Sequence, residues 1–248
     1  HGPGLDPDTK SDVGAGASLA RSGRLRIPSA DWWERDTTSV LAQFPPGLPL
    51  AIAAGVRAGL APVAAGRAVQ AAAAAVLLVV VVLLLDAVAG TPAGAIGGVL
   101  LLTMPSLAAD CVRVLSEPLF LVLLLATLAA LVRRPERPVI AGAWAALAEL
   151  TRYIGIAAGV AAILSAFGRS GTWRARMERA LEAALPVVAL HAWWSARLHT
   201  LGARAPAATR LQRGVPAELR VGARTVTEWL APALPAGPAR WVLAGLAL

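Results

Sequence analysis

The feature that most constrains this fold is an apolar run at residues 71–85, which contains no polar side chain. Together with its flanks, the stretch from residue 68 to residue 88 can cross the hydrocarbon core of a bilayer, which is about 30 Å thick. The run therefore predicts a transmembrane helix.

The composition extends this prediction to the rest of the chain. Of the 248 residues, 57% are hydrophobic and 15% are charged, and the mean hydropathy is +0.64. Soluble domains carry more charge than this. We expect an all-α fold, a polytopic transmembrane bundle in the cytoplasmic membrane. The other apolar runs lie at residues 48–63, 93–107, 118–132, 139–167, 180–196 and from 241 onward.

The charged and sulfur-containing residues exclude several classes of function. Cys111 is the single cysteine, which leaves no internal disulfide framework and no cysteine-based zinc site. The net charge of +8 comes from arginine, because Lys10 is the only lysine. The arginines lie in short runs beside apolar segments rather than in a basic patch interleaved with exposed aromatics, so nucleic acid is not an expected partner.

The distribution of arginine predicts the topology. The short arginine-rich stretches at residues 133–137 and 169–179 are expected in the cytoplasm. Counting crossings back from them gives four regions: an acidic first extracytoplasmic loop at 1–44, transmembrane helices at 45–199, an arginine-rich extracytoplasmic loop at 200–240, and the start of a further helix at 241–248. Since the chain starts at His1 and stops inside an apolar run, we expect a fragment of a longer protein.

Two apolar runs are not expected to be simple crossings. Residues 48–63 contain Arg57 as well as proline and glycine, which favours a re-entrant or interfacial helix. Residues 139–167 lie between two stretches that both belong in the cytoplasm. A helical hairpin that turns near Thr151 and Arg152 satisfies both and moves Glu149 and Arg152 away from the bilayer centre.

Several short motifs, taken in order, resemble one family. They are Pro7-Asp8-Thr9, Ala17-Ser18-Leu19-Ala20-Arg21-Ser22-Gly23, Phe44-Pro45-Pro46-Gly47-Leu48-Pro49-Leu50, Ser116-Glu117-Pro118-Leu119-Phe120 and Leu150-Thr151-Arg152-Tyr153-Ile154-Gly155. This pattern resembles the GT-C glycosyltransferases, polytopic enzymes that take sugars from polyprenyl-phosphate carriers and include the dolichyl-phosphate-mannose and aminoarabinose transferases. The resemblance covers most of the chain, but the helix expected before Asp8 is missing, and Lys10-Ser11-Asp12 stands where an aromatic residue often follows the acid.

The resemblance implies roles for particular residues. Asp8 matches the family's catalytic base, with Asp6 and Asp12 as rivals, and Glu117 is a second catalytic candidate. The base would withdraw a proton from an acceptor hydroxyl that attacks the anomeric carbon with inversion, while the lipid phosphate leaves. An arginine would neutralise that phosphate, either Arg152 or one of the arginines within 204–224. The expected substrate-binding residues are Asp12, Arg113, Arg152 and Tyr153.

Structural roles compete with these assignments. Glu117 can simply favour a helix N-terminus, and Arg152 can pair with Glu149. His191 is expected to serve packing, and Trp32 and Trp33 to lie at the membrane interface.

The expected partners are a polyprenyl-phosphate-linked sugar, the lipid bilayer, and a glycan, lipid or protein acceptor on the outer side of the membrane. The sequence does not settle metal dependence: outer carboxylates can hold Mg²⁺ or Mn²⁺, but no dedicated metal-ligand spacing is present. Two other functions are open: a transporter or lipid flippase without glycosyl transfer, and a non-catalytic membrane scaffold.

Overall fold

The computed structural model describes residues 7–28, 38–42 and 44–200, and 82% of these residues are helical. The expected helical class is therefore correct. The elements in these ranges are α1 (Pro7–Ser22), β1 (Arg26–Pro28), β2 (Thr38–Val40), α2 (Gly47–Arg57), α3 (Pro62–Ala89), α4 (Thr91–Leu102), α5 (Pro105–Arg113), α6 (Glu117–Arg133), α7 (Pro138–Thr151), the 3-10 turn η1 (Tyr153–Gly155), α8 (Ile156–Phe167) and α9 (Trp173–Thr200).

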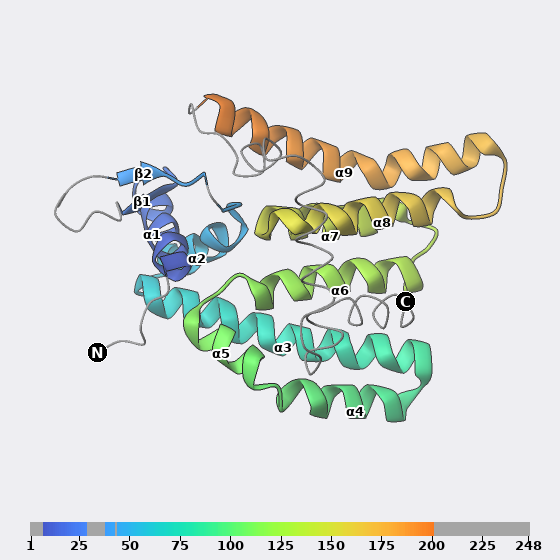
Figure 1. The fold of residues 1–248 in the computed structure, drawn as a ribbon, viewed down its shortest axis with the longest axis horizontal. Helices are drawn as coiled ribbons and strands as arrows, with labels where there is room; N and C mark the ends of the chain where they lie inside the picture. The colour runs from blue at the N-terminus through green and yellow to red at the C-terminus, as the bar shows by residue number, and fades with distance from the viewer. Residues whose placement is uncertain (1–6, 29–37, 43, 201–248) are drawn as a thin grey trace, which may run out of the picture. The chain divides into compact units, whose positions relative to one another are not determined.

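The longer helices run back and forth between two ends (Figure 1). The connections α3–α4, α6–α7 and α8–α9 lie at one end, which we call the arginine end because residues 133–137 and 169–179 lie there. At the opposite end lie α1, α2, the turn before α6 and the link between α7 and η1. The helices α3, α6 and α7 begin at or next to a proline, at Pro62, Pro118 and Pro138, where the missing N–H costs no helical hydrogen bond.

The predicted hairpin between residues 139 and 167 is confirmed. The α7 helix ends at Thr151, Arg152 is extended with ψ of 134°, and the chain returns through η1 and α8. Small residues let the two arms approach closely: Gly155 lies against Ala148 and Glu149, and a Cβ at residue 155 would overlap their backbone atoms. Ala145, Ala146 and Ala158 are buried together farther along the hairpin.

The last described helix, α9, is longer than its apolar run. It begins at Trp173, so the arginine-rich stretch expected as a loop at 169–179 is helical from residue 173 onward. It also continues to Thr200, the first residue of the loop expected at 200–240. The helix lies parallel to α7. Ala183 of α9 packs against Gly142 of α7, and farther along Trp194 donates a hydrogen bond to the Tyr153 hydroxyl. The remainder of the expected loop at 200–240 and the helix at 241–248 fall outside the described residues.

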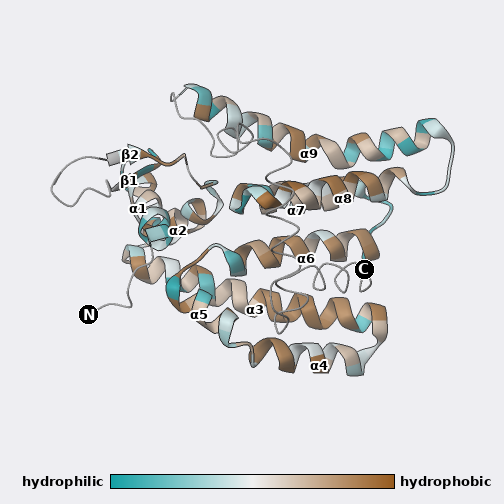
Figure 2. Ribbon diagram, in the orientation of Figure 1, coloured by the Kyte–Doolittle hydropathy of each residue, from teal (hydrophilic) through white to brown (hydrophobic). Residues whose placement is uncertain are grey.

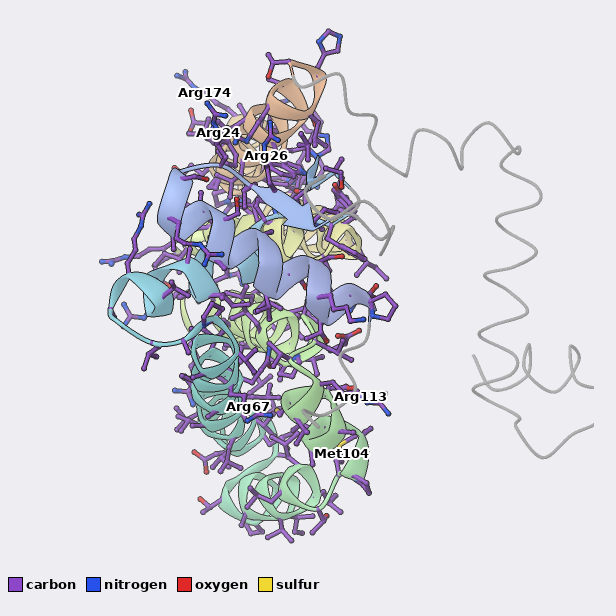
Figure 3. The ribbon with its side chains drawn as sticks, turned by 90° about the vertical axis from the view of Figure 1, so that its left-hand side faces the viewer. Arg24, Arg26, Arg67, Met104, Arg113 and Arg174 are labelled. Carbon is purple, nitrogen blue, oxygen red and sulfur yellow. The ribbon has the colours of Figure 1, made fainter. Side chains whose placement is uncertain are left out.

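The expected loop at residues 1–44 contains regular structure. The α1 helix is followed by β1 and β2, which pair antiparallel with Ile27 opposite Ser39. This small sheet departs from a purely helical fold. Seen from the end opposite the arginine end, α1 and α2 lie in front of the long helices (Figure 3). A shared core of Val13, Leu48, Ile52, Ala65 and Val114 fixes them there.

The run at residues 93–107 is broken rather than continuous. The α4 helix ends at Leu102 and α5 starts at Pro105, with a bend of 55° between them. Arg113, expected to bind substrate, is the last residue of α5. The run at 48–63 likewise yields only α2, which is 11 residues long and too short to cross a bilayer.

One described helix, α3, is long and apolar enough to cross a membrane, and α4 with α5 would be a second if the bent pair is one span. Only 17% of the apolar window of α3 is buried, although a core helix of a soluble protein would be mostly buried. In Figure 2 the hydrophobic colour extends along most of the α3 ribbon. A single helix of this kind is a weak indication of membrane association and does not establish a multi-pass topology.

Candidate functional site

The segments that carry the family resemblance come together at the end of the helices that lies opposite the arginine end. Thr9 in α1 donates a hydrogen bond to the carbonyl of Arg113, just before the Ser116-Glu117-Pro118 segment. The Tyr153 hydroxyl donates to the carbonyl of Ala42 at 3.3 Å, which links the segment after α7 to the N-terminal region. Residues far apart in sequence therefore surround one site.

The proline-proline-glycine turn before α2 packs directly on the end of α7. A Cβ at Gly47 would lie 2.6 Å from the Leu150 carbonyl oxygen and 2.8 Å from the Thr151 hydroxyl oxygen. Only glycine allows this approach, because real Cβ atoms do not come so close to such atoms. The turn thereby fixes the chain immediately before Arg152.

Arg152 lies between the predicted catalytic and binding residues. Its Nη1 atom donates to the Ser116 hydroxyl at 3.2 Å and forms an ion pair with the Glu117 carboxylate. The expected alternative, a pair between Arg152 and Glu149, is not formed. The side chains of Arg152 and Glu117 are 38% and 37% exposed, so the pair borders solvent. Oε2 of Glu117 is buried and has no hydrogen-bond partner among the described residues.

Asp12 is the buried acid of this site. It is 4% exposed, and burial, followed by repulsion from Asp8 and Glu117, raises its pKa from 3.8 to about 7, against the opposing effect of Arg152. A carboxyl with this pKa changes its charge near neutral pH, which is the property required of a general acid or base.

Asp8 precedes Asp12 by one turn of α1 and lies in the first turn of that helix. Its side chain is exposed, and it faces the site closely enough to raise the pKa of Asp12. Of the two, Asp8 is the acid that an incoming substrate can reach. Asp6 falls outside the described residues.

The turn before Glu117 is held in an unusual conformation. Val114 has φ of 60°, a left-handed conformation that β-branched residues rarely adopt. Buried side chains hold the carbonyls on either side: Thr9 binds that of Arg113, and Nε2 of Gln70 donates to that of Leu115 at 2.7 Å. These contacts compensate the backbone strain and set the position of Glu117.

Arg113 and Tyr153, both expected to bind substrate, have different surroundings. The Arg113 side chain is exposed and points away from the helices (Figure 3), while its carbonyl anchors Thr9. Tyr153 is adjacent to Arg152, and its hydroxyl accepts a hydrogen bond from Nε1 of Trp194 at 3.2 Å. Tyr153 therefore lies at the site because it follows Arg152 in the chain, whereas the Arg113 guanidinium lies outside the site.

A second polar pair lies deeper, between α7 and α9. Glu149 has a side chain 7% exposed, and one of its oxygens contacts Nδ1 of His191. The other oxygen is buried and lacks a partner among the described residues. The sequence did not predict this pair, since His191 was expected to serve packing. The signal lay in a glutamate within an apolar helix, which needs a polar partner.

The sequence left metal dependence open and indicated no metal ligands. The described part of the chain contains no group of three or more histidine, cysteine, aspartate or glutamate residues that could hold a metal ion. The expected arginines within 204–224 and the tryptophans Trp32 and Trp33 lie outside the described residues.

No family model, curated protein or solved structure matches this chain. The family resemblance therefore rests on the sequence motifs alone.

Proposed function

We propose that this chain is part of a polytopic membrane glycosyltransferase that moves a sugar from a polyprenyl-phosphate carrier to a lipid, glycan or protein acceptor. One observation carries the proposal. Segments that resemble GT-C enzymes at residues 7–9, 44–50, 116–120 and 150–155 gather around Arg152, although they are widely separated in sequence. Chance motif matches would not be expected to converge in this way.

In the proposed reaction, a carboxylate of α1 withdraws the proton of the acceptor hydroxyl as that oxygen attacks the anomeric carbon. The bond from the anomeric carbon to the phosphate oxygen breaks, and the lipid phosphate leaves with the electron pair. Asp8 takes the role of base because it is exposed and matches the family position. Asp12 is buried one turn away and has a pKa of about 7, so its own charge, which acts on Asp8, changes near neutral pH.

Arg152 takes the role of stabilising the leaving phosphate. Guanidinium groups bind phosphate oxygens through charge-assisted hydrogen bonds, and a group already held in place needs no reorganisation during the reaction. Glu117 and Ser116 hold Nη1 of Arg152, while more than a third of the side chain is exposed. In this proposal Glu117 is a positioning residue that acts through Arg152, rather than a base.

The proposed topology places the site outside the cytoplasm and the arginine end inside it. Arginine-rich connections face the cytoplasm in multi-pass proteins, and the connections α6–α7 and α8–α9 share one end of the helices (Figure 1). The acids of α1 and Arg152 lie at the other end. A lipid-borne donor would reach them from the outer leaflet.

A transporter or flippase is the competing function, and two observations favour it. The α4 and α5 helices are bent by 55° at a break, as in transporters with discontinuous helices. The buried Glu149 carboxylate contacts His191, whose side chain is half-exposed, and a buried ionisable residue in an apolar helix is common in proton-coupled carriers. Neither observation explains why the motif segments meet at Arg152.

The test is sugar release from radiolabelled polyprenyl-phosphate donors by the full-length protein in liposomes, beside Asp8→Asn and Asp12→Asn. Loss of turnover on the order of 10²-fold or more in Asp8→Asn, with expression unchanged, supports the proposed base. A larger loss in Asp12→Asn moves the base to that residue. Absence of turnover with every donor, together with lipid or solute transport that survives Asp8→Asn, supports the transporter instead.

A further inference from the structure

The arginine end of the helices carries a dense group of cations that the proposed sugar transfer does not use. Residues 133–137 contain three arginines and one glutamate, and residues 169–179 contain four arginines and one glutamate. The two stretches are joined by side-chain contacts to the helix ends, so they belong to one surface.

Part of this set stabilises the fold itself. Arg133 donates to the carbonyl of Leu83 at 2.6 Å, and Arg169 donates to that of Leu131 at 3.3 Å. The Leu131 carbonyl lies in the last turn of α6, where backbone oxygens lack helical partners and the helix dipole favours positive charge. The Leu83 carbonyl lies farther inside its helix, six residues before the end of α3. Arg176 likewise donates to the carbonyl of Phe167 at 2.8 Å, at the end of α8.

Other arginines keep their donors available. The side chains of Arg134 and Arg137 are exposed and make no hydrogen bond or ion pair with other described residues, and only their backbone groups are bonded. Arg179 differs from these two: its Nη2 donates to the carbonyls of Arg169 and Ser170, and its Nε atom is buried and out of reach of a ligand. The carbonyl contacts leave each guanidinium with additional N–H groups.

Aromatic and aliphatic residues place this surface at the boundary of an apolar region. Trp173 is 64% exposed and packs edge-on against Phe167, with ring centroids 5.2 Å apart. Arg176 lies over the Phe167 ring at 4.4 Å from its centroid. Exposed aliphatic side chains such as Val88 and Leu164 occupy the neighbouring ends of α3 and α8. Tryptophan and arginine next to an apolar helix surface are typical of the lipid headgroup layer.

We propose that the arginine end, defined by residues 133–137 and 169–179, is a binding surface for anionic lipid headgroups. The charges favour phosphodiester headgroups that carry a net negative charge over zwitterionic ones. Arg134 and Arg137 provide free guanidinium groups for the phosphate, and Trp173 lies at the depth of the headgroups. The inference depends on insertion of the helices in a bilayer, but not on glycosyl transfer.

The experiment measures lipid binding to the full-length protein in detergent micelles by native mass spectrometry, during titration with phosphatidylglycerol or phosphatidylcholine. The test variant is Arg134→Gln/Arg137→Gln, whose side chains make no contact that the fold requires. The matched control is Arg21→Gln/Arg24→Gln, which removes the same charge from exposed positions in and just after α1, at the other end.

We expect the wild type to bind phosphatidylglycerol more tightly than phosphatidylcholine, with a preference that weakens as salt increases. The test variant should lose on the order of tenfold in phosphatidylglycerol affinity with an unchanged unfolding midpoint, and the control should lose little. Equal binding of the two lipids, or equal losses in both variants, would overturn the inference. Displacement of phosphatidylglycerol by millimolar inorganic phosphate would also contradict it, because it would identify a general anion site rather than a lipid surface.

Sugar transfer by the same proteins separates this inference from the proposed function. Turnover that is retained in Arg134→Gln/Arg137→Gln while lipid binding falls shows that the two properties reside at opposite ends. Absence of turnover in every protein leaves the lipid titration interpretable, since it depends only on the arginine end.

Discussion

Replacing Asp12 with asparagine should change how the stability of the protein depends on pH. The fold opposes ionisation of this carboxyl, because burial and the charges of Asp8 and Glu117 raise its pKa from 3.8 to about 7. One pKa unit corresponds to about 1.4 kcal/mol. Ionised Asp12 therefore costs the folded state roughly 4 kcal/mol, an order-of-magnitude figure.

The direction in which stability changes with pH depends on which state of the protein binds the Asp12 proton more tightly. Since the pKa of Asp12 is higher in the folded state, its stabilising contribution is complete below pH 3.8 and is lost as the pH rises through about 7. Between about pH 5 and about pH 8, the wild type should lose roughly 2 to 3 kcal/mol of unfolding free energy from this group. Asp12→Asn lacks that loss, because the amide stays neutral throughout.

The assay is reversible unfolding of the full-length protein in mixed detergent micelles, monitored by circular dichroism at both pH values. Exposed Glu182, replaced by glutamine, serves as a control whose pH dependence should match the wild type. Asp12→Asn should be more stable than the wild type by roughly 1 to 2 kcal/mol at the lower pH and by roughly 4 kcal/mol at the higher one. A stability difference between Asp12→Asn and the wild type that is constant across the pH range would refute the reasoning.

The remaining predictions concern the contacts around the site. Gln70→Ala should lower the unfolding free energy by about 2 kcal/mol, measured by the same unfolding assay, because it leaves a cavity and frees the carbonyl before α6. Gly47→Ala should cost about 1 to 3 kcal/mol in that assay by forcing α2 away from the end of α7; an unchanged midpoint would contradict the close approach. His191→Ala should cost about 1 to 3 kcal/mol because Glu149 loses its partner, whereas His191→Gln should recover part of that stability in the same titration.

The sequence predicted that most of the helices exist, but it did not predict where several of them begin and end. The hairpin at Arg152 was predicted because the arginine-rich stretches on both sides of residues 139–167 belong in the cytoplasm, which a single crossing helix would not allow. This constraint lies within one segment of the sequence. The break before Pro105 and the helical start at Trp173 were missed, since hydropathy reports apolar length and not where a helix begins. Likewise, α1 contains too little apolar periodicity to be recognised without the surface on which it packs.

At the site, residue types were predicted and pairings were not. Sequence proximity favoured Glu149 as the partner of Arg152, but the extended conformation of Arg152 directs it to Glu117 instead. Glu149 then requires another partner, His191, from a helix distant in sequence. Tertiary contacts of this kind have no local signal. Burial of Asp12 rather than Asp8 also depends on the packing of α1 against its neighbours.

The most direct test of the proposed mechanism is a double-mutant cycle on sugar release, with Arg152→Gln, Glu117→Gln and the double variant in liposomes. If Glu117 acts by holding Arg152, each single variant should lose kcat, and the double variant should be no worse than Arg152→Gln alone. Losses that multiply would show that the two residues act independently and would contradict the positioning role. Turnover unaffected by either substitution would remove the site from sugar transfer altogether.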